Sequence, residues 1–121
     1  AEISEDVQSR IFLFDLEAKG LRYLMYLMLK SEVYLGANTG LTHVAAAANT
    51  KVIALFSPIK TQSAARWRPM SKNQENVVTI VPDVICGESH ACALRHCPYY
   101  ECMSKIEVED VVLEAIKLLE K

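Results

Sequence analysis

Two kinds of segment alternate along this chain: short continuous runs of apolar residues, and longer stretches in which apolar residues recur every three or four positions. Four runs, at residues 10–16, 33–36, 51–56 and 77–81, are rich in β-branched and large apolar side chains and predict strands. We expect the first run to be a buried strand that leaves into a turn at Lys19-Gly20. Strands that alternate with helices form parallel sheets with right-handed crossovers, so the pattern predicts an α/β fold.

Three helices are predicted beside these strands. The first opens at Leu21 and repeats apolar residues every three or four positions, at Leu21, Leu24, Met25, Met28 and Leu29. The second covers residues 41–48 and consists mainly of small side chains. The third covers residues 107–121, has acids in its first turn and lysines in its last, and carries an expected apolar face of Val108, Val111, Val112, Ala115, Ile116 and Leu119.

Two connections are expected to be irregular. Residues 57–59 end the third strand, and residues 61–74 are polar, which indicates a long surface loop with room for one helical turn. Pro82 ends the fourth strand. The stretch 83–105 contains all four cysteines of the chain and is expected to be an irregular connection.

Composition narrows the class of protein. With 121 residues, 51% of them hydrophobic, the chain suits one compact domain. A net charge of -2 gives no positive field for a polyphosphate backbone, so nucleic acid is a poor candidate partner. No apolar run reaches the ~20 residues that cross a bilayer, and the first ten residues are polar rather than signal-like. We expect a soluble cytosolic chain and, since a strand is predicted only ten residues from its start, a piece of a longer protein.

The segment 36–48 contains the most informative chemistry. A predicted strand enters a tight turn at Asn38-Thr39-Gly40, and a helix follows. A glycine lets a ligand approach the backbone, and the unpaired N–H groups at a helix start suit a diphosphate. Thr39 and Thr42 add hydroxyl groups, and His43 follows about one turn into the helix. The alternative is an ordinary helix cap followed by an alanine run that packs closely on a sheet.

These residues also resemble a known family. The stretch Gly-Ala-Asn-Thr-Gly-Leu-Thr-His-Val-Ala-Ala-Ala-Ala at 36–48, followed by Lys-Val-Ile-Ala-Leu-Phe-Ser-Pro, resembles the ADP-heptose:lipopolysaccharide heptosyltransferases, glycosyltransferase family 9. The Arg-Trp-Arg-Pro segment at 66–69 and the pattern Cys86, Cys92, Cys97, Cys102-Met103 agree with that family. The resemblance extends from about Phe12 to Leu119.

The resemblance implies a three-layer Rossmann-like parallel sheet, the C-terminal half of a GT-B glycosyltransferase. Residues 1–121 would then form the domain that binds the nucleotide-sugar donor, and the chain would be part of a two-domain enzyme. By this resemblance Thr39 and Gly40 contact the donor diphosphate, and His43 reaches a phosphate oxygen. The family's catalytic base and its acceptor site, for the lipopolysaccharide core, belong to an N-terminal domain. The resemblance calls for neither cofactor nor metal and places the enzyme in the cytoplasm, peripheral to the inner membrane.

Several positions extend or depart from the family pattern. The family usually has an aspartate where this chain has Asn38, which can still cap the helix or bind a sugar hydroxyl but lacks a negative charge. Glu32 replaces another common aspartate and is interpreted as structural. Further candidate donor contacts are Thr42, the stretch from Asp15 to Lys19 beside the nucleoside, and the arginines Arg66 and Arg68.

A second cluster gathers Cys/His residues that zinc could use: Cys86, His90, Cys92, His96, Cys97 and Cys102. Their spacings exceed those typical of zinc knuckles, which favours partly buried thiols, with disulfides forming on isolation, over a metal site or a Cys/His nucleophile. Three hypotheses therefore stand at the level of sequence. They are a glycosyltransferase donor domain, a non-catalytic nucleotide-binding or interaction module, and a metal-stabilised folding module.

Overall fold

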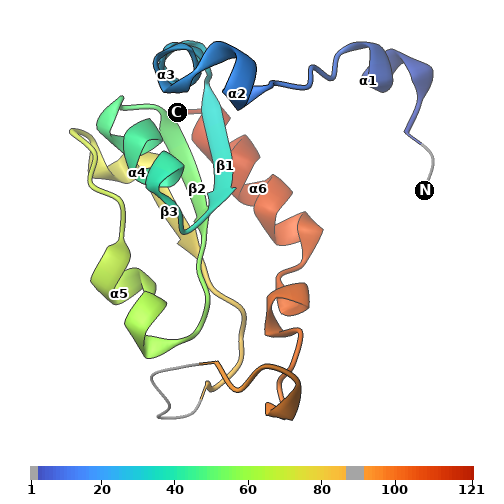
Figure 1. The fold of residues 1–121 in the computed structure, drawn as a ribbon, viewed down its shortest axis with the longest axis vertical. Helices are drawn as coiled ribbons and strands as arrows, with labels where there is room; N and C mark the ends of the chain where they lie inside the picture. The colour runs from blue at the N-terminus through green and yellow to red at the C-terminus, as the bar shows by residue number, and fades with distance from the viewer. Residues whose placement is uncertain (1–2, 87–91) are drawn as a thin grey trace.

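The computed structural model describes residues 3–86 and 92–121 of the chain (Figure 1). Its helices and strands, in chain order, are α1 (Glu5–Ser9), α2 (Leu16–Lys19), α3 (Leu21–Lys30), β1 (Val33–Ala37), α4 (Gly40–Ala47), β2 (Lys51–Leu55), α5 (Ala64–Trp67), β3 (Val77–Ile80) and α6 (Val108–Leu119). Short 3₁₀ turns lie between them: η1 (Lys60–Gln62), η2 (Gln74–Asn76), η3 (Leu94–His96) and η4 (Cys102–Lys105).

The three strands form one parallel sheet in the order β1-β2-β3. Gly36 of β1 pairs with Ala54 of β2, and Ala54 pairs with Thr79 of β3. Because every strand runs the same way, all three carboxyl ends meet at one edge of the sheet. Open α/β sheets bind their ligands outside that edge.

Helices flank both faces of the sheet (Figure 1). On one face α3 and α4 form a buried core with β2 and β3, made of Met28, Ala45, Ala46, Val52, Ala54, Phe56 and Val77. Ile53 points to the opposite face by strand alternation, and α6 contacts β1 and β2 with Leu118 fully buried. The fold is therefore α/β and Rossmann-like, as the sequence predicts.

Small side chains set how closely α4 approaches the sheet. Ala45 and Ala46 are completely buried against the core, where larger side chains would hold the helix away. After α4 the chain turns through Asn49, which has positive φ, and buried Thr50 donates its hydroxyl proton to the carbonyl of Met28 (2.7 Å). This hydrogen bond joins the end of α3 to the start of β2.

The strand predicted at residues 10–16 is wrong. Residues 11–15 form neither helix nor strand between α1 and α2, and Phe12 and Leu13 are 88% and 98% exposed. A strand needs a neighbour for its N–H and C=O groups and a face to bury, and among the described residues the sheet offers this segment neither. Asp15 instead precedes α2 and caps its start, its carboxylate accepting the backbone N–H groups of Glu17 and Ala18.

The apolar face predicted for the last helix is partly wrong. Leu118 is the buried residue of α6, with Val111 and Ala115 half-buried beside it. Val108, Val112, Ile116 and Leu119 are exposed, and Val108 has 71% of its surface accessible. The helix is therefore rotated relative to the predicted face.

The remaining predicted elements are confirmed to within a residue or two. The first helix, the strands at 33, 51 and 77 and the helix at 41 are present, and the polar loop after β2 contains the single turn α5. The cysteine-rich connection contains only the 3₁₀ turns η3 and η4 in its described part. Over residues 3–86 and 92–121, each helix is too short or too polar to traverse a lipid bilayer.

Candidate functional site

A hollow of about 560 Å³ lies beside the carboxyl ends of β1 and β2. Residues from three segments line it: the turn after β1, the first turns of α4, and the loop after β2 with α5. The lining residues are Asn38, Thr39, Gly40, His43, Thr61, Gln62 and Trp67. The hollow thus contains Thr39, Gly40 and His43, which the sequence predicts for the diphosphate, and Asn38, which it predicts for the donor sugar or the helix cap.

Asn38 joins the two loops that border this hollow. Its backbone N–H donates to the carbonyl of Leu55 (3.0 Å), which continues the β1–β2 pairing one residue past the strand. Its side-chain Nδ2 donates to the carbonyl of Gln62 (3.3 Å). Asn38 therefore ties the turn before α4 to the loop after β2, a role that needs the N–H donor of an amide.

The start of α4 faces the hollow with its backbone donors. Thr39 is the N-cap residue in extended conformation, and within the described chain its side chain makes no capping hydrogen bond. No acidic residue lies in the first turn of α4. The N–H of Thr42 already donates to the carbonyl of Thr39 (3.1 Å), so the N–H groups of Gly40 and Leu41 and the positive end of the helix dipole are what this helix start offers to an anion.

Gly40 is the first residue of α4, and a Cβ at this position would project into open space with no described atom within 4 Å. The backbone there has no positive φ that would require glycine. The described protein itself would therefore tolerate a side chain at Gly40. A ligand that lies against the backbone at Gly40 is a physical reason for the absence of a side chain at this position.

Thr42 is placed differently from Thr39. It is fully buried, and its hydroxyl donates to the carbonyl of Ala37 and lies 3.5 Å from the hydroxyl of Tyr34. The side chain of Tyr34 also lies over Gly36, so a Cβ added at Gly36 would be 2.5 Å from the tyrosine hydroxyl. The structure thus gives Thr42 a position beneath the turn, where it fixes the β1–α4 connection.

The loop after β2 supplies a wall that the reasoning from sequence did not assign. Thr61, Gln62 and Trp67 line the hollow, and the Trp67 indole Nε1 donates to the carbonyl of Thr61 (2.7 Å). The sequence signal for this wall is the Arg-Trp-Arg-Pro segment, in which the tryptophan, and neither arginine, lines the hollow. Gln62 carries no comparable signal because its contact uses a backbone carbonyl.

Other candidate contacts lie outside this hollow. Asp15 and Lys19 belong to the start and end of α2, which packs against α3 at the other end of β1 (Figure 1). Arg68 donates to the carbonyl of Val77 (3.0 Å) and so holds the loop to β3. Arg66 is exposed, and its guanidinium carbon lies 5.7 Å from the Trp67 ring centroid. Arg66 and Arg68 both flank Trp67 in the chain, and Arg66 is the one whose guanidinium lies near the Trp67 ring.

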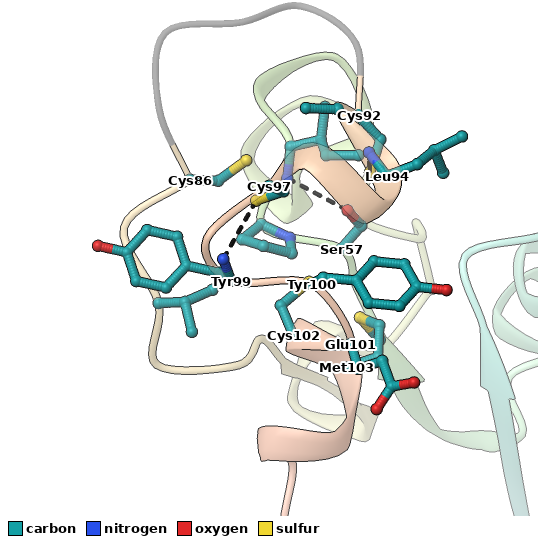
Figure 2. Close-up of a pocket in the computed structure, with 14 residues that line it drawn as sticks. Ser57, Cys86, Cys92, Leu94, Cys97, Tyr99, Tyr100, Glu101, Cys102 and Met103 are labelled. Atoms are coloured by element: carbon teal, nitrogen blue, oxygen red, sulfur yellow. Dashed lines mark hydrogen bonds between the residues drawn. The ribbon is translucent and has the colours of Figure 1, made fainter.

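All four cysteines line a second, apolar cavity of about 210 Å³ (Figure 2). Its floor is Ser57, Pro58 and Ile59 after β2, and the segment from Cys92 to Met103 closes it. The sulfur of Cys92 accepts the backbone N–H of Leu94, and that of Cys97 accepts the N–H of Tyr99, each at 3.4 Å. Every one of these cysteines is a free thiol, and three are half-buried.

The hypothesis of a metal site involves the same cysteines, which line this apolar cavity. Within residues 3–86 and 92–121, no three His, Cys, Asp or Glu side chains are grouped so that they could hold a metal ion. His90, which the sequence placed in the Cys/His cluster, lies outside the described residues. His96 is exposed in η3, and it is not among the residues that line the cavity.

Comparison with known proteins adds one finding. The family model described as glycosyltransferase family 9 (heptosyltransferase) matches residues 16–94, which is more than half of the chain. The match includes the whole turn before α4, the helix itself and the wall around Trp67. No curated protein and no solved structure matches the chain.

Proposed function

The chain belongs to glycosyltransferase family 9, and from this membership we propose that it binds the nucleotide-sugar donor of a glycosyl transfer. The donor diphosphate would lie against Thr39 and Gly40 at the start of α4, with His43 on a phosphate oxygen. The observation that carries this proposal is the hollow that contains all three residues at the carboxyl edge of the sheet.

The chemistry of the hollow supports an anionic ligand. Backbone N–H groups at the start of a helix are fixed donors, and they need no rearrangement when a diphosphate binds. His43 can donate a hydrogen bond from its ring and, when protonated, adds a positive charge. The open space at Gly40 lets phosphate oxygens approach the backbone closely.

The same donors would serve the reaction. In a glycosyl transfer the bond between the anomeric carbon and the diphosphate oxygen breaks, and a nucleoside diphosphate leaves with the bonding electrons. Fixed donors on the departing oxygens stabilise this developing charge and lower the barrier. An acceptor hydroxyl forms the new bond and gives its proton to a base, which we assign to a separate N-terminal domain.

The finer parts of the proposal follow the family resemblance. We propose that the donor is ADP-heptose, that the acceptor is the lipopolysaccharide core, and that residues 1–121 are the donor half of a GT-B enzyme acting in the cytoplasm at the inner membrane. The parallel sheet flanked by helices supports the donor half, because half-domains of this type bind nucleotides at the carboxyl edge of the sheet.

Calorimetric titration with ADP tests the donor site. We expect the chain to bind ADP, and the combined substitutions Gly40→Val and His43→Ala to weaken binding about 100-fold. Valine fills the space through which a phosphate oxygen approaches the backbone, and His43→Ala removes a hydrogen bond to a charged group. Lys72→Ala is the matched control, since it removes an exposed cation outside the hollow and should leave the affinity unchanged. Equal affinity in the double variant and the parent chain would refute the proposed site.

One observation favours a second candidate, a nucleotide-binding module that does not catalyse transfer. The Asn38 amide donates to the carbonyl of Gln62, whereas an aspartate would place a carboxylate against that carbonyl. The hydrogen bond that joins the two loops around the hollow therefore depends on the neutral amide of Asn38. This amide lacks the negative charge that could stabilise an electron-poor anomeric carbon. Transfer of sugar from donor to acceptor by this chain would exclude the second candidate.

A further inference from the structure

Trp67, the last residue of α5, lines the same hollow as Thr39, Gly40 and His43. It is the only tryptophan in the sequence and retains 46% of its surface exposed. A large apolar ring left half-exposed beside polar groups is typical of a ligand site, where aromatic side chains supply area and a few polar groups fix orientation.

The indole is held in one orientation by the protein itself. Its Nε1 donates to the carbonyl of Thr61 (2.7 Å), and the backbone N–H of Trp67 donates to the carbonyl of Ser63 (3.0 Å). The only polar atom of the ring is therefore already paired. What the ring presents to the hollow is apolar, and its position is set before any ligand arrives.

The surroundings of the ring indicate which part of a donor it meets. With its N–H engaged, the indole has no donor for a phosphate oxygen, but its surface can pack against carbon-bound hydrogens. Asn38 belongs to the same wall through its bond to Gln62, and its amide has a second N–H and a carbonyl oxygen that suit hydroxyl groups. An apolar ring beside an amide matches a sugar, which has both C–H and O–H faces.

We propose that Trp67 is the surface on which the sugar ring of the donor packs, with Asn38 beside it for the sugar hydroxyls. This inference rests on the proposed function, because it places the diphosphate at Thr39, Gly40 and His43. Trp67 then acts on the sugar end of the donor and leaves the affinity for the nucleoside diphosphate alone nearly unchanged. It is a specificity-determining residue that selects a nucleotide sugar over the free nucleotide.

The single tryptophan permits a direct test by fluorescence. The probes are ADP and ADP-heptose, titrated into the 121-residue chain, with calorimetry run in parallel to measure affinity. We expect ADP-heptose to change the tryptophan emission as it binds, and ADP to bind with little change in emission. A packed aromatic contact predicts that Trp67→Ala weakens ADP-heptose about 3- to 10-fold and ADP less than about 2-fold.

Two variants separate packing from a structural role. Trp67→Tyr retains an aromatic ring and should recover most of the affinity for ADP-heptose that Trp67→Ala loses. Tyr26→Ala removes an exposed aromatic ring of α3 outside the hollow and should change neither affinity. Circular dichroism of each variant verifies that the fold is retained.

The outcomes distinguish the two proposals. If ADP and ADP-heptose lose affinity equally in Trp67→Ala, or if emission is unchanged at saturating ADP-heptose, the packing role is refuted while the donor site stands. If the parent chain binds neither probe, the donor site fails, and the inference about Trp67 fails with it.

Discussion

Two threonines three residues apart, Thr39 and Thr42, show how differently one side-chain type is used near the hollow. Thr39 is exposed and lines the hollow, whereas Thr42 is fully buried and donates to the carbonyl of Ala37. The sequence offered both as ligand contacts, since both follow the same strand. Their burial assigns Thr42 a structural role and leaves Thr39 as the threonine that we propose for binding.

The same substitution at both positions should therefore give opposite results. Thr42→Val keeps the shape of the buried side chain but leaves the carbonyl of Ala37 without its hydroxyl donor, so we expect the free energy of unfolding to fall by about 1–2 kcal/mol. Thr39→Val should change stability by less than about 0.5 kcal/mol, because the residue is exposed, and should weaken ADP binding instead. Urea denaturation and calorimetry measure the two effects, and equal stability loss in both variants would contradict this assignment.

At the scale of elements, the local sequence pattern indicates which type of element a segment can form, and neighbouring segments decide whether a strand forms and which face of a helix is buried. The strands β1, β2 and β3 are each short apolar runs and are confirmed, but residues 11–14, an equally apolar run, form no strand. The difference is a hydrogen-bonding neighbour, which a sequence pattern does not contain. The helix α6 shows the same limit, because its periodicity indicates a helix while the sheet decides which side is buried.

Two adjacent leucines test that rotation of α6. Leu118 is 1% exposed and Leu119 is 48% exposed. Leu118→Ala should lower the free energy of unfolding by about 2–4 kcal/mol, because it leaves a cavity against the sheet. Leu119→Ala should cost less than about 1 kcal/mol, since part of its surface is already in water. Chemical denaturation that gives the larger loss at Leu119 would restore the face predicted from the sequence.

At the scale of the whole molecule, the hollow brings together segments far apart in the chain. Residues 38–43 and 61–67 meet only because β1 and β2 are parallel neighbours whose carboxyl ends share one edge. The site is therefore a property of the folded sheet, so a ligand bound there should stabilise the entire fold. Binding to the folded state alone raises its stability through mass action.

ADP should accordingly raise the melting temperature of the chain. At about 100 times its dissociation constant, ADP is expected to add about 2.7 kcal/mol to the free energy of unfolding, which corresponds to a shift of several degrees. The proposed donors are backbone N–H groups and side chains, so EDTA should leave the shift unchanged. A shift that disappears with EDTA and returns with Mg²⁺ would contradict this set of contacts.

The sequence by itself determined the α/β class, the three strands of the sheet, and the Asn38, Thr39, Gly40 and His43 grouping, because these depend on side-chain periodicity and on residues adjacent in the chain. Only the tertiary structure decided that Thr42 is buried, that residues 11–14 pair with no strand among the described residues, and that Trp67 joins the hollow. Each of these depends on contacts between segments distant in sequence, which packing and hydrogen-bond pairing select in the folded chain.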